Sequence, residues 1–140
     1  ASAVMMGTIF VASAECLAHK KYKSALIAAT SNDTVLTICF DGGWPHAPHR
    51  VLRNSTFRNW ESAGCLPPGR RPGEGDEIAF SQIGEAILRY EDTAPSAKVE
   101  GNIEAMCLYS GTGVDAVARV LPASQVVKSI WQETQSLLTS

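Results

Sequence analysis

The chain opens with two apolar runs joined by a Gly-Thr step, and this opening constrains the fold more than any other feature. Residues 3–6 read Ala-Val-Met-Met, Gly7 and Thr8 follow, and residues 9–13 continue as Ile-Phe-Val-Ala-Ser. Such a run predicts a buried β-strand over residues 4–6 that opens into a turn and then a helix. Backbone N–H groups left free at a strand-to-helix turn bind anions, most often phosphate. Because a buried strand needs neighbours and none precedes this one, we expect the chain to be the C-terminal part of a larger fold.

Composition is that of a folded, globular protein. The 140 residues are 45% hydrophobic and 19% charged, which is enough apolar material for one core. The net charge of −2 gives no reason to expect nucleic acid as a partner. No apolar run is long enough to span a bilayer, and no signal peptide is recognisable. We therefore expect a cytoplasmic protein without a membrane partner.

The cysteines and histidines do not form a metal-binding pattern. The cysteines are Cys16, Cys39, Cys65 and Cys107. They are widely spread with no Cys-x-x-Cys pair, so we interpret them as free, buried thiols of a reducing compartment. His46 and His49 have the spacing of two ligands on a helix, but the prolines that alternate with them exclude a helix. We expect loop histidines and no metal.

Hydrophobic periodicity and turn residues predict short helices and strands separated by long loops. The ranges expected to be helical are 18–29, 53–61, 103–109 and 122–138. The strongest strand is expected over residues 34–40, and residues 77–80 and 86–90 are expected to pair as a hairpin. Residues 41–50 and 66–76 are rich in glycine and proline, which predicts loops.

The residues that could bind a ligand each have two interpretations. Gly7 and Thr8 could form a phosphate cradle, or Thr8 could simply cap the helix that follows. The Gly-Thr-Gly run at residues 111–113 has the same ambiguity. Tyr109 could line a pocket or be a half-buried aromatic with a solvated hydroxyl. No combination of nucleophile and base is recognisable.

Three arginines, Arg50, Arg53 and Arg58, lie close together in the sequence. They could bind an acidic ligand, because guanidinium groups pair well with carboxylates and phosphates. The interpretation we favour is a solvated helix face with local ion pairs.

Several stretches, in order along the chain, match the sequence patterns of one family. Residues 4–13 are similar to its Met-Gly-Thr-Arg-Phe-Leu-Ala-Thr segment, and residues 109–114 are similar to Tyr-Ala-Gly-Gln-Gly-Val. Residues 48–57 and 68–76 are similar to a bacterial branch, and the helix at 122–131 also fits. On these matches the chain resembles the nitronate monooxygenases, once called 2-nitropropane dioxygenases.

The resemblance implies an α/β fold: the C-terminal segment of an FMN-binding (β/α)8 barrel, with a smaller α+β domain inserted. Residues 1–17 would form the last barrel strand and phosphate-binding turn, residues 18–113 the inserted substrate domain, and residues 114–140 the closing helix. Tyr109 would line the substrate pocket. The cofactor-binding residues that the resemblance implies are Met5, Met6, Gly7, Thr8, Gly111 and Thr112.

The resemblance also implies a reaction, the oxidation of an alkyl nitronate by FMN and oxygen to a carbonyl compound and nitrite. The catalytic base of the family would lie outside this chain, so none of His19, His46 and His49 takes that role. We expect the chain to be inactive alone. Ile9 and Thr112 stand where the family usually has arginine and glutamine. An exposed last strand would favour self-association or a companion chain.

Two alternatives remain open. The first is a flavin enoyl or quinone reductase segment, because such enzymes share the barrel and a fold does not determine the chemistry. The second is a non-catalytic α+β interaction module, which would be a stable monomer without affinity for flavin. Residues 53–54 and 68–70 favour the nitronate branch.

Overall fold

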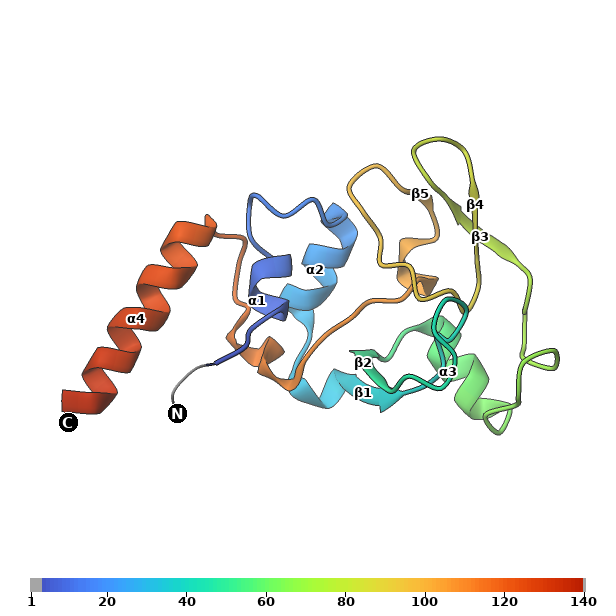
Figure 1. Ribbon diagram of the computed structural model, residues 1–140, viewed down its shortest axis with the longest axis horizontal. Coiled ribbons are helices and arrows are strands. Elements are labelled where there is room, and N and C mark those ends of the chain that lie inside the picture. Colours follow the sequence, from blue (N-terminus) through green and yellow to red (C-terminus); the bar gives the residue numbers. More distant parts are fainter. Residues whose placement is uncertain (1–3, 140) are drawn as a thin grey trace.

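Short helices and short antiparallel strands make up the computed structural model, which describes residues 4–139 (Figure 1). The α-helices are α1 (Thr8–Val11), α2 (Lys20–Ala28), α3 (Ser55–Ser62) and α4 (Ala123–Thr139). The strands are β1 (Thr34–Thr37), β2 (His49–Leu52), β3 (Glu77–Phe80), β4 (Ala86–Leu88) and β5 (Glu100–Gly101). Three 3₁₀ helices are η1 (Ser31–Asp33), η2 (Ile103–Ala105) and η3 (Thr112–Ala116). The structure is therefore mixed α/β.

The strands form two small antiparallel sheets. One pairs β1 with β2, and the other has the order β4-β3-β5. The predicted hairpin of residues 77–80 and 86–90 is confirmed as β3 and β4. The predicted strand over residues 34–40 is shorter, because pairing with β2 ends at Thr37. The prediction of a loop through residue 50 was wrong at its end, where His49 and Arg50 pair with β1.

Side chains hydrogen-bond to the first turns of three helices, and the cap of α3 is the one that its local sequence predicts. The His19 side chain accepts a hydrogen bond from the N–H of Lys21 and begins α2. Asn54 accepts from the N–H of Phe57 at 3.1 Å and begins α3. The predicted last helix is confirmed as α4, and the Glu15 carboxylate accepts from its Ala123 N–H at 2.9 Å.

The prediction of a helix over residues 103–109 is wrong beyond the first turn. Only η2 is helical, and the chain then runs extended to Tyr109, which bridges to Val51. Side chains of α3 hold the intervening carbonyls: the Thr56 hydroxyl donates to the Ala105 carbonyl, and the Asn54 amide donates to the Met106 carbonyl. These bonds replace those that a helix would make.

The prediction of a buried strand over residues 4–6 is also wrong. These residues have no regular structure, and Val4 is 70% and Met5 100% exposed. A strand is held by hydrogen bonds to a neighbouring strand. Within the described residues no strand lies beside this segment to supply them.

Buried side chains form three clusters rather than one. One joins α1 and α2 to η3 through Ala12, Leu26 and Val114. A second lies under β3 and β4, and a third surrounds Phe40 and Phe57. Helix α4 meets this body only near its first turns, where Val126 is buried (Figure 1). Most of α4 therefore projects from the body.

The expectation of free, buried thiols holds for two of the cysteines. All four are free, but only Cys39 and Cys107 are buried, while Cys16 is partly exposed and Cys65 is exposed. Burial raises the pKa of both the Cys39 and Cys107 thiols to about 12. These two side chains are therefore neutral and unreactive at physiological pH.

Candidate functional site

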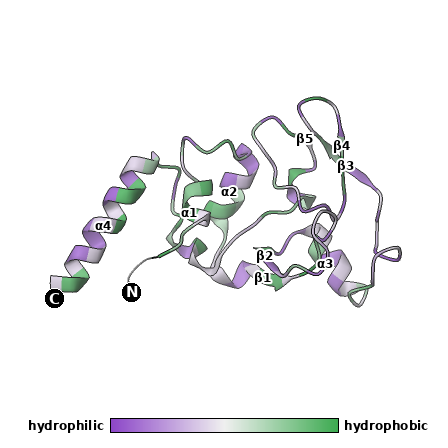
Figure 2. Ribbon diagram, in the orientation of Figure 1, coloured by the Kyte–Doolittle hydropathy of each residue, from purple (hydrophilic) through white to green (hydrophobic). Residues whose placement is uncertain are grey.

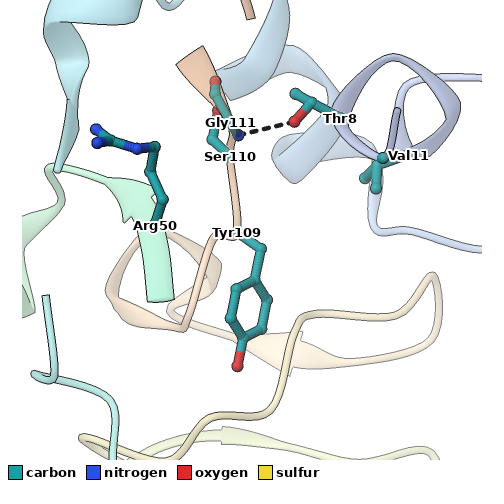
Figure 3. A pocket seen from close by; sticks show the side chains of 7 residues that line it. Thr8, Val11, Arg50, Tyr109, Ser110 and Gly111 are labelled. Carbon is teal, nitrogen blue, oxygen red and sulfur yellow. Dashed lines mark hydrogen bonds between the residues drawn. The ribbon is translucent and has the colours of Figure 1, made fainter. Parts of the chain in front are cut away.

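A pocket of about 200 Å³ lies where the start of α1 meets the first half of β2 and the segment before η3 (Figure 3). Its lining residues are Gly7, Thr8, Val11, Arg50, Tyr109, Ser110 and Gly111. These residues come from segments that are distant in the sequence. The pocket therefore depends on the folded structure, and not on one local turn.

A hydrogen bond between Thr8 and Gly111 closes one side of this pocket. The Thr8 hydroxyl oxygen accepts from the Gly111 N–H at 2.8 Å, joining residues 103 positions apart (Figure 3). The alternative in which Thr8 caps α1 is wrong, because Gly7 is the N-cap and no side chain caps this helix. A Cβ on Gly111 would lie 3.4 Å from the Thr8 oxygen, an ordinary van der Waals distance, so this hydrogen bond does not itself require a glycine.

The backbone at Gly7 is open to a ligand. Apart from its neighbours along the chain, no described residue has an atom within 4 Å of the position that a Cβ on Gly7 would take. The N–H groups of Phe10 and Val11 both donate to the Gly7 carbonyl. The preceding N–H groups of Thr8 and Ile9 have no acceptor among the residues that the structure describes. Free amides beside an open glycine are typical of an anion site.

Tyr109 is fixed in the wall of the pocket by both its backbone and its hydroxyl. Its carbonyl accepts from the Tyr22 hydroxyl at 2.5 Å, and its own hydroxyl donates to the Asp92 carbonyl at 3.0 Å. The ring meets the edge of His49 with centroids 5.8 Å apart. Burial raises the pKa of the Tyr22 and Tyr109 hydroxyls, so both remain neutral donors.

The His49 ring packs against Tyr109, and both of its ring nitrogens already have hydrogen-bond partners. Its Nδ1 lies 2.9 Å from the Ala47 carbonyl, and its Nε2 accepts from the Phe40 N–H at 3.4 Å. This arrangement fits a neutral ring protonated on Nδ1. His49 therefore positions its neighbours, and the expectation that it is a loop residue was wrong because it lies in β2.

The structure brings together only part of the predicted site. Gly7, Thr8 and Gly111 meet at the pocket with Tyr109. Met5 and Met6 do not line it and are exposed, because the expected strand is missing. Thr112 is exposed at the start of η3, also outside the lining.

Val11, Arg50 and Ser110 line the pocket but were not among the predicted site residues. The three arginines were interpreted together as a helix face, but Arg50 lies in β2 and only Arg58 lies in α3. The Arg50 guanidinium donates to the Thr34 hydroxyl across β1 and β2 at 3.1 Å. Strand pairing, which the sequence alone did not reveal, separates it from the other two.

Neither a metal-binding cluster nor a membrane-spanning helix is found among residues 4–139. No group of three or more His, Cys, Asp or Glu residues in this range could hold a metal ion. No helix in the same range is long and apolar enough to cross a membrane.

Comparison with solved structures shows that this chain has a fold similar to part of FabK. FabK from Thermotoga maritima has a similar structure, with a TM-score of 0.69 and 27% sequence identity over 99% of this chain and 39% of FabK. The FabK M276A mutant from the same organism gives a TM-score of 0.60 at 24% identity, and 35% of that chain is covered.

Comparison of the amino-acid sequence with known families shows which family the chain belongs to. The sequence model of nitronate monooxygenase matches residues 1–133, so the chain belongs to the nitronate monooxygenase family. A nitronate monooxygenase of Pseudomonas aeruginosa is 29% identical over 133 residues, which is 95% of this chain and 33% of that protein. The resemblance found from sequence motifs is thus confirmed. The chain spans about a third of the length of these relatives.

Proposed function

We propose that this chain holds the phosphate end of FMN in a flavin-dependent nitronate monooxygenase. The observation that carries the proposal is the meeting of Gly7, Thr8 and Gly111 at one pocket, in a member of this family. The pocket of about 200 Å³ suits a phosphate better than a whole flavin. The remainder of the cofactor would then contact residues outside this pocket.

The residues at the start of α1, together with Gly111 and Tyr109, have definite tasks in this proposal. The free N–H groups of Thr8 and Ile9 donate to phosphate oxygens, and the absent side chain of Gly7 leaves room for them. The Thr8 hydroxyl keeps Gly111 in place while its own hydrogen remains available to donate. Bound FMN would supply the redox chemistry, and Tyr109 would border the nitronate.

The proposal also assigns each segment of the chain to a domain of the enzyme. On this view residues 1–17 and 114–140 belong to an FMN-binding barrel, and residues 18–113 form the inserted substrate domain. The base that takes a proton from substrate lies on other residues of the family fold, since His49 already uses both ring nitrogens. We therefore propose that the chain binds FMN yet forms no nitrite from an alkyl nitronate and oxygen by itself.

A titration of the 140-residue chain with FMN, followed by quenching of flavin fluorescence, tests the phosphate site. We expect saturable binding that Gly7→Asp abolishes, because a carboxylate there repels phosphate and fills the open space. Gly113→Asp is the matched control, since Gly113 has equal room for a side chain but does not line the pocket. Absence of FMN binding by a compact monomer would contradict the proposal and favour the interaction module.

A further inference from the structure

A second cavity, of about 670 Å³, opens between the start of α2 and the hairpin of β3 and β4. Its lining includes His19, Lys20, Phe80, Lys98 and Glu100. It shares no lining residue with the pocket at the start of α1. Its volume is in the range of small-molecule sites, so it has room for a ligand of its own.

The segment of residues 95–101 connects the two walls of this cavity. Ser96 bridges Ala18 just before α2, and Glu100 pairs with Phe80 in the sheet of β3 and β5. Figure 1 shows this segment between α2 and the hairpin of β3 and β4. Backbone pairing therefore builds the cavity, which does not depend on the side chains of one exposed loop.

His19 gives this cavity a buried hydrogen-bond donor. The residue is only 9% exposed, and its Nδ1 accepts from the Lys21 N–H at 3.0 Å. In a neutral ring this leaves the proton on Nε2, which has no acceptor among residues 4–139. Every fully buried side-chain nitrogen or oxygen in that range has a partner, so the unpaired Nε2 is not sealed from solvent. Because His19 lines the cavity, this donor opens into it.

Two lysines share the cavity with this donor and have no counter-ion. Lys20 is the first residue of α2, and Lys98 lies in the segment before β5. Neither pairs with a carboxylate in the described part of the chain, and Glu100, the one carboxylate of the lining, pairs with no cation there. The Lys20 N–H likewise has no acceptor within residues 4–139. The cavity therefore has an excess of positive charge and several unused donors.

We infer that this cavity binds a small organic anion whose phosphate or carboxylate oxygens accept from the His19 Nε2–H and pair with Lys20 and Lys98. Both lysines are cations that attract such oxygens, and the free N–H at the start of α2 adds to the attraction. Phe80, which is 43% exposed, supplies apolar surface for the organic part of the ligand. The inference does not rest on the proposed function, because the two sites have different residues.

The probes for this site are phenyl phosphate, benzoate and the uncharged phenol, each added to the 140-residue chain. NMR signals of the His19 ring nitrogens and of the Lys20 amide report binding. We expect saturable shifts with an anion and none with phenol, and the affinities for the two anions distinguish a phosphate site from a carboxylate site.

Three lysine variants show whether the cavity binds the anion. Lys20→Met and Lys98→Met should each weaken binding about tenfold, the effect of losing one charge-assisted hydrogen bond. Lys21→Met is the matched control, since it removes the same charge from the next position of α2 but lies outside the lining, and it should leave the affinity unchanged. Equal weakening by Lys20→Met and Lys21→Met would indicate general attraction to a basic helix and would overturn the inference.

Gly7→Asp separates the two sites, because Gly7 lines only the other pocket. This variant should bind the anions as the wild type does. Loss of their binding in Gly7→Asp would place them in the other pocket and overturn the inference, as would equal shifts with phenol or the absence of saturable binding. Each of these outcomes leaves the titration with FMN to decide the proposed function.

Discussion

At the scale of single residues, the Thr8 hydroxyl is the group that joins α1 to the segment before η3. We expect Thr8→Val to expose the Gly111 N–H, because valine has the same shape but accepts no hydrogen bond. The loss should cost about 1 kcal/mol of folding free energy. Hydrogen exchange of the Gly111 amide, together with urea unfolding, measures both effects.

Two further variants make this experiment specific. Thr8→Ser keeps the acceptor and should retain slow exchange at Gly111. Thr112→Val changes an exposed threonine that neighbours the same glycine, and it should leave exchange unchanged. Unaltered protection of Gly111 in Thr8→Val would show that the bond does not hold this segment.

The candidate site was only partly predictable, and Arg50 shows why. Gly7 and Thr8 were recognisable as a candidate site because they stand where an apolar run is predicted to turn into a helix, a place where backbone N–H groups are left free. Arg50 was placed at the end of the predicted loop of residues 41–50, and its charge was interpreted together with those of Arg53 and Arg58 as part of a solvated face. Its place on β2 depends on pairing with β1, a non-local contact that local pattern does not encode.

At the scale of elements, the cap of α2 makes the stability of the protein depend on pH. The neutral His19 ring accepts from the Lys21 N–H at 3.0 Å. Burial, and then the charges of Lys21 and Lys20, lower the pKa of His19 from its usual 6.5. The unfolded chain therefore binds this proton more readily than the folded one. The contribution of His19 to stability is therefore complete above its usual pKa of 6.5 and is lost as the pH falls through 6.5 toward the lower pKa of the folded state.

Urea unfolding at about pH 8 and about pH 5 measures this dependence. We expect the wild type to lose more stability between the two values than His19→Asn, because asparagine caps the helix without titrating. His46→Asn changes an exposed histidine of a loop and should retain the wild-type dependence. An equal loss in wild type and His19→Asn would contradict the proposed origin of the effect.

The loop of residues 66–76 is held by Arg71 rather than by regular structure. The guanidinium pairs with Asp41 and Glu74, both at 2.5 Å, and lies over the ring of Tyr90 at 4.3 Å. Its side chain is only 8% exposed. The loop was predictable from its glycines and prolines, but this clamp was not, because Asp41 lies 30 residues earlier.

Arg71→Met tests the clamp. The substitution leaves Asp41 and Glu74 without their cation, and we expect it to lower the free energy of unfolding by about 3 kcal/mol. Limited proteolysis should then cut within residues 66–76 much faster than in the wild type. Arg70→Met removes the neighbouring exposed arginine and should alter neither result. Equal cutting of both variants would show that the ion pairs do not order the loop.

At the scale of the whole molecule, helix α4 was predictable in type and extent, but its surroundings were not. Its apolar stripe indicated a helix that packs on a core. In the structure Val126 is buried, while Val127 is 55% and Trp131 60% exposed. Hydrophobic and hydrophilic positions alternate along α4, which stands apart from the rest of the ribbon except near its start (Figure 2). The sequence pattern predicts that the helix has an apolar face, but it does not predict which surface covers that face. The same holds for residues 4–6, whose apolar character was interpreted as a buried strand.

The exposed face of α4 leads to the last prediction, self-association of the 140-residue chain. Exposed apolar side chains on one helix face favour burial against a second surface. This chain covers a third of its nitronate monooxygenase relative, and that third does not show which surface covers the helix. We expect a concentration-dependent increase in molar mass by size-exclusion chromatography with light scattering. Val127→Glu combined with Trp131→Glu should return the chain to a monomer, whereas Gln132→Glu, a polar position of the same helix, should not. A wild-type chain that is monomeric at every concentration would contradict this prediction, and if it also bound no FMN, the interaction module would be the better description.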